Sequence, residues 1–200
     1  MNPLKFKTAD LRTMKAEEIF KISGALLEGH TEFYNGKHGN GWIEKGFIIR
    51  HPNLLEELSR RQAEQIKKFY PNTNFIVGTA YNGTVVASYV ARHLNTLFAH
   101  TYGKGQDISF HRMFKPPKGL NLCFVEDLIF SGTDVSDHIN FFKNYSLNIQ
   151  GVSVWVNRQK DIIQETKITS LINTPFRFYE KETCPLCQKK VPIRYLNSRE

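Results

Sequence analysis

Two adjacent carboxylates, Glu126 and Asp127, end an apolar run in the segment LNLCFVEDLIFSGTDVSDHI. Placed side by side they repel each other unless a cation or a hydroxyl group lies nearby, and neither adds to a hydrophobic core. Ser131, Gly132 and Thr133 follow, and a loop of small residues before a helix offers backbone N–H groups and the positive end of the helix to an anion. The pattern favours a site for sugar hydroxyls and a phosphate. The alternative is a strand that ends in a solvated acidic turn.

The segments around these carboxylates alternate between strands and helices. Continuous apolar runs predict strands in NFIVG, TLFAH, CFVE, IQGVSVWVN and FRFYE. Apolar residues at helical spacing predict helices over 2–29, from Pro52 onward, over 84–94 and over 134–145, with an irregular stretch at 34–42 and a long loop, with room for a hairpin, from 101 to 119. Apolar strands separated by helices predict an α/β fold with a parallel sheet covered on both faces. In such sheets ligands bind beyond the carboxyl ends of the strands, where the two carboxylates lie.

The composition sets limits on the class of protein. At 200 residues and 40% hydrophobic content, the chain is long enough for one compact domain and short for two. No apolar run has the length of a membrane span and the first residues lack the apolar core of a signal peptide, so we expect a cytoplasmic protein. The formal net charge of +8 attracts anions, which could be nucleic acid or a small phosphorylated ligand. The basic residues are scattered along the chain, so the charge alone favours neither.

The three cysteines do not indicate a disulfide framework, because their number is odd and no secretion signal accompanies them. Cys123 lies in an apolar run and is expected in the core. Cys184 and Cys187, in CPLC, have a spacing that can hold zinc. A structural zinc site needs four ligands and the chain has no second cysteine pair, so a tight turn stiffened by Pro185 is the favoured interpretation and zinc the alternative.

Several segments together resemble a known family. FVEDLIFSGTD resembles the phosphoribosyl pyrophosphate signature of the type I phosphoribosyltransferases, and four further segments resemble orotate phosphoribosyltransferase in particular: YNGKHGNGWIEK, GTAYNG, VNRQ and CPLCQKKVPI. The similarity runs from about residue 20 to residue 193, and the shared order of the motifs is more specific than any one of them. It implies a parallel sheet flanked by helices as one domain over 1–200, with a small cap from 1–50 and 176–200 and a mobile catalytic loop over 100–118. In this family that loop reaches the active site of the neighbouring subunit, so a homodimer is also implied.

The resemblance also implies roles for individual residues. The reaction would transfer phosphoribosyl from phosphoribosyl pyrophosphate to orotate, with Mg²⁺ as cofactor, and catalysis would rest on Lys104, Glu126 and Asp127. The residues implied in binding phosphoribosyl pyrophosphate are Thr79, Ala80, Tyr81, Asn82, Gly83, Glu126, Asp127, Leu128, Ile129, Phe130, Ser131, Gly132, Thr133 and Asp134. The residues expected around orotate are Phe130, Arg158, Lys37, His38 and Lys45. Because Mg²⁺ is usually held through substrate oxygens, no dedicated set of protein metal ligands is expected.

The chain departs from the family pattern at positions that normally carry positive charge. The family has cations where this chain has His100-Thr101, Gln106, Asn82 and Tyr34, and a threonine where it has Phe130. Each charge-assisted hydrogen bond contributes about 1.5–3 kcal/mol, so several unreplaced losses would weaken binding by orders of magnitude. Lys37, His38, Lys45 and Arg112 are candidates to compensate.

Four hypotheses therefore stand. The first is an orotate phosphoribosyltransferase with a divergent loop, and the second is a phosphoribosyltransferase for another base, because Phe130 would stack on or block the ring. The third is a non-catalytic relative that binds the ligand without turnover, against which the retained Glu126 and Asp127 argue. The weakest is nucleic-acid binding, which depends on charge alone.

Overall fold

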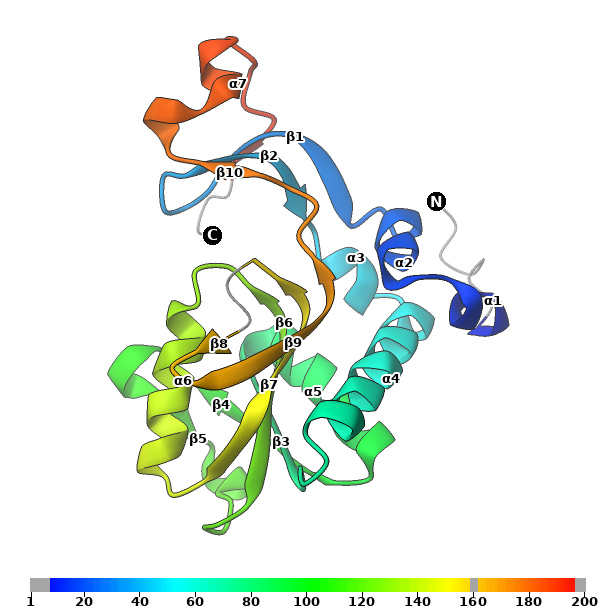
Figure 1. Ribbon diagram of the computed structural model, residues 1–200, viewed down its shortest axis with the longest axis vertical. Helices are drawn as coiled ribbons and strands as arrows, with labels where there is room; N and C mark the ends of the chain where they lie inside the picture. Colours follow the sequence, from blue (N-terminus) through cyan, green and yellow to red (C-terminus); the bar gives the residue numbers. More distant parts are fainter. Residues whose placement is uncertain (1–7, 159–161, 197–200) are drawn as a thin grey trace.

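The computed structural model describes residues 8–158 and 162–196, and its body is one large sheet. Its strands are β3 (Phe75–Thr79), β4 (Leu97–Tyr102), β5 (Ser109–Phe110), β6 (Asn121–Ile129), β7 (Asn148–Asn157), β8 (Ile162–Ile163) and β9 (Thr166–Asn173). They lie in the order β5-β4-β3-β6-β7-β9-β8 (Figure 1). The five inner strands are parallel, and each edge strand is antiparallel to its neighbour. The predicted α/β fold is confirmed.

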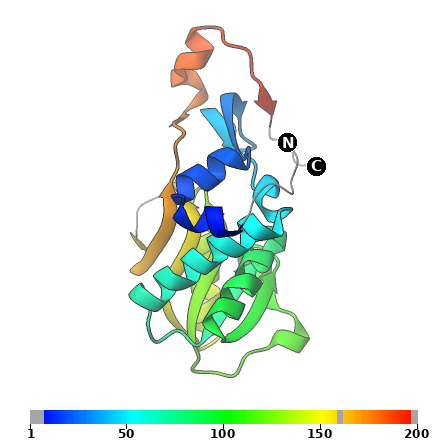
Figure 2. The same cartoon turned by 90° about the vertical axis from the view of Figure 1, so that its right-hand side faces the viewer.

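Helices cover both faces of this sheet. The long helices are α4 (Pro52–Phe69), α5 (Ala80–Leu94) and α6 (Thr133–Asn144). Ile76 of β3 packs in one buried cluster with α4 and α5, whereas Phe75 and Val77 pack in a second cluster with α6. Neighbouring residues of a strand point to opposite faces, so a strand buried on both sides must be apolar throughout. This explains why the core strands are continuous apolar runs. Figures 1 and 2 show α4 and α5 together on one side of the sheet and α6 on the other.

A second, smaller sheet forms the cap that the resemblance implied. It contains β1 (Leu26–Glu32), β2 (His38–Ile43), β10 (Phe178–Tyr179) and β11 (Tyr195–Leu196), in the order β10-β2-β1-β11. The two ends of the chain thus meet in one sheet, above the carboxyl ends of the core strands (Figure 1). The short helices α1 (Thr8–Thr13), α2 (Ala16–Ile22), α3 (Gly46–Ile49) and α7 (Pro185–Gln188) complete the fold.

The structure corrects the sequence-based prediction in two places near the cap. The helix predicted over 2–29 ends at Ile22 in its described part, and the irregular stretch predicted over 34–42 is largely strand β2. Both errors have one cause: β1 and β2 are short, glycine-containing strands whose stability comes from pairing with each other and not from propensity. Gly41 shows how tightly the cap packs, because a Cβ there would lie 2.2 Å from the ring of Phe176.

The segment expected as a loop over 100–118 contains regular structure. Strand β4 continues through Tyr102, and β5 returns beside it as the hairpin for which the sequence left room. Two short 3₁₀ helices, Gly105–Asp107 and Arg112–Phe114, lie within it. Strand β9 was not predicted at all. None of the described helices is both long and apolar enough to cross a bilayer.

Candidate active site

A cavity of about 450 Å³ lies between the carboxyl ends of the core strands and the cap. It opens beside β3 and β6, which are neighbours in the sheet. The chain leaves β3 for β4 on one side and leaves β6 for β7 on the other, so the cavity occupies the point where the winding direction reverses. Two loops therefore diverge there and leave room for a ligand.

The paired carboxylates form the floor of this cavity. Glu126 accepts hydrogen bonds from the backbone N–H groups of Thr79 (3.3 Å) and Asp127 (3.2 Å). Burial raises the pKa of Glu126 well above its ordinary value, and the neighbouring charge of Asp127 raises it further. Asp127 is 4% exposed, and its carboxylate lies 3.3 Å from the Nζ atom of Lys45, which comes from the cap. The repulsion between the two carboxylates is thus offset by amide donors and one lysine.

The turn after β3 fits closely around Glu126. A Cβ at Gly83 would lie 2.2 Å from a carboxylate oxygen of Glu126, so only glycine permits this approach. Ala80 has a φ of 52°, a left-handed conformation that is rare for a residue with a Cβ and that concentrates at ligand-binding turns. Tyr81 is 92% exposed beside it. The segment GTAYNG therefore forms a shaped turn facing the cavity, as a ligand-binding turn would.

The loop between β6 and α6 offers donors for an anion. Gly132 has a φ of 81°, and the hydroxyls of Ser131 and Thr133 are joined by a hydrogen bond of 3.1 Å. Helix α6 is held in place by His138, whose Nδ1–H donates to the Asp134 carbonyl at 2.7 Å and whose Nε2 lies 3.1 Å from the Thr101 hydroxyl. The N-terminus of α6, where N–H groups lack partners within the helix, thus lies at the cavity.

Arg158 forms the other end of the cavity, inside an aromatic cluster. The carbon of its guanidinium group lies 2.9 Å from the ring centroid of Phe178, 3.6 Å from that of Phe130 and 5.4 Å from that of Phe33. Its Nε is buried and has no hydrogen-bond partner among the described residues. Burial lowers the pKa of Arg158 to about 9, which leaves it protonated at pH 7. A buried, charged donor on a cavity wall is suited to a planar anion.

Three cations, Lys45, Lys104 and Arg158, line the cavity among the described residues. The residues Glu126, Asp127, Asp134 and Asp137 bring carboxylates to the same walls. Lys104 lies between Gly103, whose φ is 87°, and Gly105, whose φ is 54°. The resemblance implied that this lysine acts in the neighbouring subunit, but the structure places it in the cavity of its own chain.

Two residues expected around orotate lie elsewhere. Lys37 forms an ion pair of 2.6 Å with Glu180 at the surface of the cap, and His38 is buried with its Nδ1 2.8 Å from the Nε2 of His30. Neither lines the cavity, so their expected contact with the base is corrected. The reason is the register of the β1–β2 hairpin, which the sequence did not predict. Lys45, the third expected cation, does line the cavity.

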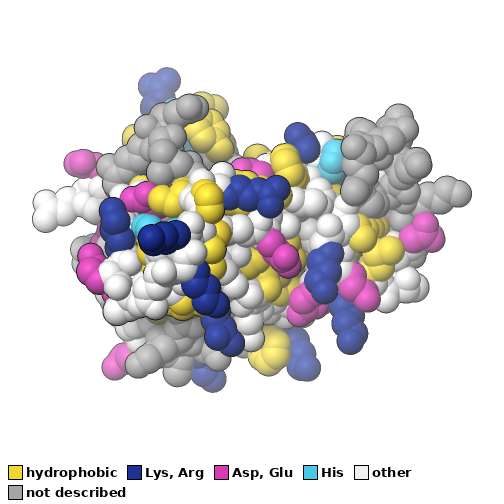
Figure 3. All heavy atoms as spheres, turned by 90° about the horizontal axis from the view of Figure 1, so that it is seen from above, with side chains coloured by type: hydrophobic (Ala, Val, Ile, Leu, Met, Phe, Trp, Pro, Cys, Tyr) yellow, Lys and Arg dark blue, Asp and Glu magenta, His cyan; other side chains and the backbone are white. Residues whose placement is uncertain are grey.

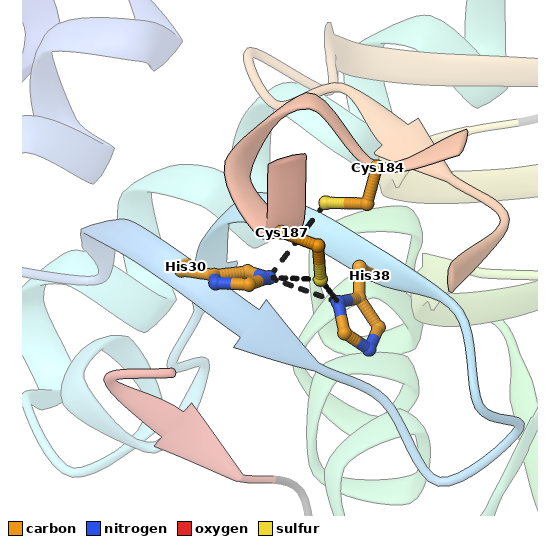
Figure 4. Close-up of side chains that lie close together, drawn as sticks. All are labelled: His30, His38, Cys184 and Cys187. Carbon is orange, nitrogen blue, oxygen red and sulfur yellow. Dashed lines mark hydrogen bonds between the residues drawn. The ribbon is translucent and has the colours of Figure 1, made fainter. Parts of the chain in front are cut away.

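The aromatic residues of the cap were missed by sequence reasoning. Phe33, Trp42 and Phe178 line the cavity opposite the carboxylates, together with Tyr34 and Phe130. Phe33, Trp42 and Phe178 come from three separate segments, so no spacing marks them as a group. The sequence-based statement that CPLC lacks a second pair of metal ligands was also too narrow. His30 and His38 face Cys184 and Cys187 in the cap (Figure 4).

Known proteins are similar to this chain in sequence. An orotate phosphoribosyltransferase of Caldanaerobacter subterraneus is 28% identical over 93% of this chain and 97% of its own length. One of Caldicellulosiruptor saccharolyticus is 29% identical over 92% of this chain and 95% of its own length. No family model matches the chain.

Solved structures extend the similarity to a second activity. The orotate phosphoribosyltransferase of Aeropyrum pernix superposes with a TM-score of 0.68 at 18% identity, covering 80% of this chain and 93% of that one. The adenine phosphoribosyltransferase of Saccharomyces cerevisiae does so with a TM-score of 0.62 at 17% identity, covering 82% and 99%. At these sequence identities the structural similarity shows the fold and does not indicate which base this chain uses.

Proposed function

Because the chain belongs to the type I phosphoribosyltransferase family, we propose that it transfers phosphoribosyl from phosphoribosyl pyrophosphate to orotate and releases pyrophosphate. One observation carries the proposal: the Glu126–Asp127 pair, the N-terminus of α6 and the buried Arg158 line a single cavity. The first two suit a ribose and its 5-phosphate, and the third suits a carboxylate on the accepting base. That combination matches both substrates of this reaction.

In this proposal the 5-phosphate binds at Ser131, Gly132, Thr133 and Asp134. The backbone N–H groups of this loop and the hydroxyls of Ser131 and Thr133 donate to its oxygens, and the helix dipole of α6 adds favourable charge. The Asp134 carboxylate does not bind the phosphate, because like charges repel. Leu128 and Ile129 end the strand that places the loop, and the turn of Thr79, Ala80, Tyr81, Asn82 and Gly83 lies where the pyrophosphate would bind.

Mg²⁺ fits the chemistry of this cavity. Four carboxylates and three cations line it among the described residues, so two highly charged substrates need more positive charge than the side chains provide. Carboxylate oxygens such as those of Glu126 and Asp127 are donors that Mg²⁺ prefers, alongside substrate oxygens. When bound, the ion would supply charge that neutralises the pyrophosphate.

The protein groups then act on the charges that develop as the bond between C1 and pyrophosphate breaks. Positive charge grows on the ribose, and the carboxylates of Glu126 and Asp127 stabilise it while they accept hydrogen bonds from the ribose hydroxyls. Negative charge grows on the leaving pyrophosphate, and Lys104 neutralises it. Asp127 exchanges its contact with Lys45 for a ribose hydroxyl, which frees Lys45 to contact a substrate oxygen.

Orotate binds through its carboxylate at Arg158. The guanidinium lies against Phe130 and Phe178, which fix its plane so that two N–H groups can donate in parallel to the carboxylate. The aromatic rings of the cap then contact the flat pyrimidine. The nitrogen of the base attacks C1 from this side of the cavity.

A second candidate is transfer to a base other than orotate. Phe130 stands where the resemblance implies a threonine, and its ring belongs to the aromatic cluster, 5.1 Å from the centroid of Phe33 and 6.0 Å from that of Phe178. Such a wall favours stacking over hydrogen bonding, which would suit a purine as well as a pyrimidine. The similarity to an adenine phosphoribosyltransferase structure is in keeping with this alternative. A third candidate, binding without turnover, follows from the missing cations.

Pyrophosphate release distinguishes these candidates. The purified protein is incubated with phosphoribosyl pyrophosphate, Mg²⁺ and one base at a time, with orotate, uracil, adenine, hypoxanthine and guanine as the panel. We expect release with orotate and none with the other four. Faster release with a purine would replace the first candidate by the second. Binding of phosphoribosyl pyrophosphate without release for any base would favour the third.

The proposal extends to assembly and location. A homodimer and a cytoplasmic location are expected, and the three free thiols of Cys123, Cys184 and Cys187 suit a reducing compartment. Nucleic acid stays the weakest candidate. Figure 3 shows Lys and Arg side chains interspersed with Asp and Glu on the face seen from above, and such a mixed surface does not resemble a basic stripe.

A further inference from the structure

Four metal-ligating side chains converge in the cap, outside the cavity. The Nε2 of His30, the Nδ1 of His38 and the sulfurs of Cys184 and Cys187 all lie within 4.8 Å of one another (Figure 4). The closest approaches are 2.8 Å between the two nitrogens, 3.2 Å from Cys187 to His38 and 3.7 Å from each sulfur to His30. Tetrahedral zinc bonds of about 2.0–2.3 Å place neighbouring ligand atoms roughly 3.3–3.8 Å apart. The cluster therefore needs only small shifts to surround one ion.

The imidazole of His30 is already oriented as a ligand. Its Nδ1–H donates to the carbonyl of Val191 at 2.7 Å, which leaves the lone pair of Nε2 facing the cluster. The Nδ1 of His38 lies opposite that lone pair. Without a metal, either two lone pairs face each other, or His38 carries its proton on Nδ1 and its buried Nε2 lacks a donor among the described residues. A cation between the two nitrogens removes the first conflict.

The peptide segment around the cysteines has little else to hold it in place. Of residues 181–194, Cys184 is the one that is buried, and the rest are partly or fully exposed. The turn is closed by backbone hydrogen bonds from Gln188 to Cys184 (3.1 Å) and from Lys190 to Cys187 (2.9 Å). Such a segment buries too little apolar surface to balance the entropy lost on ordering. A structural metal is a common solution for small units of this kind.

We propose that His30, His38, Cys184 and Cys187 bind one structural Zn²⁺ ion. Two thiolates and two imidazoles in a tetrahedral arrangement favour zinc over the hard cation Mg²⁺, which prefers oxygen. All four positions are filled by protein, so no position is open for catalysis. None of the four residues lines the cavity among the described residues, so this site is separate from the proposed Mg²⁺ position.

The ion has a specific mechanical role. It joins β1 and β2, which carry the histidines, to the segment that follows β10. Strand β10 contributes Phe178 to the wall around Arg158, and Phe178 pairs with Gly39 of β2. Zinc therefore fixes the C-terminal segment on the hairpin and, through it, the wall on which the base is expected to bind.

Metal content tests the proposal directly. The full chain is produced without a polyhistidine tag, under reducing conditions, and its zinc is measured by mass spectrometry of the elements. We expect about one zinc per chain, and Co²⁺ in its place should give the intense visible bands of tetrahedral coordination with a thiolate charge-transfer band. A chain that retains no zinc and fails to take up Zn²⁺ or Co²⁺ when titrated overturns the proposal, as does a Cys184–Cys187 disulfide in that preparation.

Variants separate this site from other cysteines and histidines. Cys187→Ser and His38→Ala should each reduce the zinc content at least tenfold, whereas the matched controls Cys123→Ala and His111→Ala should retain it. Cys187 is chosen because it is only partly buried, so its replacement is compatible with folding. Full zinc content in Cys187→Ser and His38→Ala would overturn the assignment.

Proteolysis gives a readout that needs no activity. Lys181, Lys189 and Lys190 are exposed trypsin sites in the segment that the ion would hold. A strong chelator should speed cleavage at these sites severalfold, and added Zn²⁺, but not Mg²⁺, should restore protection. Equal cleavage with and without chelator would contradict a structural role.

Discussion

The wall of the cavity that belongs to the core sheet and the wall that belongs to the cap are built in different ways. On the core side, Glu126 and Asp127 lie in strand β6, which is buried on both faces. The loop before α6 follows that strand directly. On the cap side, Phe33 directly follows β1, Trp42 lies in β2 and Phe178 lies in β10, so this wall forms only when β10 pairs with β2. The core side keeps the Glu126–Asp127 motif of the family but departs from the family pattern at Asn82 and Phe130, and the cap side departs from it at Tyr34.

The difference shows how the two substrates are expected to be recognised. A sugar phosphate is recognised by backbone donors and carboxylates at strand ends, which the fold itself positions. A base is recognised by side chains, which change without disturbing the fold. The core wall should therefore tolerate substitution poorly, and the cap wall should determine which base is used.

The largest effect should come from the core wall. Asp127→Asn should weaken binding of phosphoribosyl pyrophosphate at least about 100-fold, because two charge-assisted hydrogen bonds contribute about 3 kcal/mol or more together. Isothermal titration calorimetry measures the affinity, and circular dichroism checks that the fold is kept. The matched control is Asp137→Asn, a carboxylate of the same cavity that belongs to α6. Equal loss in both variants would mean that the cavity responds to charge in general and not to Asp127.

A smaller effect, specific to the base, should come from Arg158, which follows core strand β7 and lies against Phe178 of the cap wall. Arg158→Ala should lower kcat/KM for orotate by about 2–4 kcal/mol, or roughly 30- to 1000-fold, since it removes the fork that holds the carboxylate. Affinity for phosphoribosyl pyrophosphate should stay within about twofold. Arg158→Lys should recover only part of the loss, because lysine keeps the charge and not the planar fork. A similar loss of phosphoribosyl pyrophosphate affinity would show that the two walls do not act separately.

Lys104 belongs to neither wall, and its effect should be on turnover. Lys104→Ala should lower kcat about tenfold or more with little change in affinity, because the charge it neutralises develops only in the transition state. Since Lys104 is the one cation of this loop that lines the cavity among the described residues, and it is exposed to solvent, activity should also fall with added salt. Initial rates at several substrate and salt concentrations measure both.

The position of Lys104 allows a test of assembly. Mixing Lys104→Ala with Asp127→Asn chains should not restore activity, because Lys104 lines the cavity of its own chain and each subunit would lack one residue. Restored activity, up to about a quarter of the wild-type level for random dimers, would instead place Lys104 in the partner's site. That result would support the arrangement implied by the resemblance, in which the loop of one subunit reaches the active site of its neighbour.

The smallest effect should be on stability. The pKa of Glu126 is raised, so the folded state binds more protons than the unfolded state above the ordinary value of 4.5, and stability falls as pH rises through the raised pKa. Glu126→Gln removes the titrating group, but its single oxygen can accept only one of the two amide hydrogen bonds, which go to different oxygens of Glu126. The fall in Tm with rising pH should therefore be smaller in Glu126→Gln than in the wild type. Thermal melts from pH 4 to pH 9 measure this. If the Tm of the wild type rises with pH across this range and the Tm of Glu126→Gln changes in the same way, the raised pKa of Glu126 is contradicted.

The same contrast explains what the sequence could predict. The core strands other than β9, and helix α4, were predicted because burial on one or two faces leaves a pattern in neighbouring residues, and the Glu126–Asp127 motif is contiguous. Strand β9 is only partly buried and lacks that pattern. Strands β10 and β11 are two residues long and exist only because β2 and β1 provide partners. The segment FRFYE predicted a strand where β10 lies, whereas β11 was not predicted, and the pairing of both strands depends on long-range contacts that leave no local pattern.

The metal cluster could be predicted only in part from the sequence. CPLC was recognised as a possible zinc motif, but its partner ligands are distant in the sequence: His38 lies 149 residues before Cys187. One signal could have found them: two histidines eight residues apart flank the turn-forming segment YNGK, and a hairpin there brings them to neighbouring strands. The predictions of a helix over 2–29 and of an irregular stretch over 34–42 together excluded that hairpin.

The meeting of both chain ends in the cap has a consequence for synthesis. The core sheet can begin to form while the ribosome is still adding residues, because its parallel strands and helices follow one another along the chain. The hairpin of β1 and β2 leaves the ribosome before the core strands, whereas its partners β10 and β11 leave after them. During that interval its apolar face is available to chaperones and to other nascent chains. The cap wall of the cavity is thus completed only after β10 and β11 have been synthesised, and truncation before residue 178 should leave a chain with a core sheet and an unfinished cap.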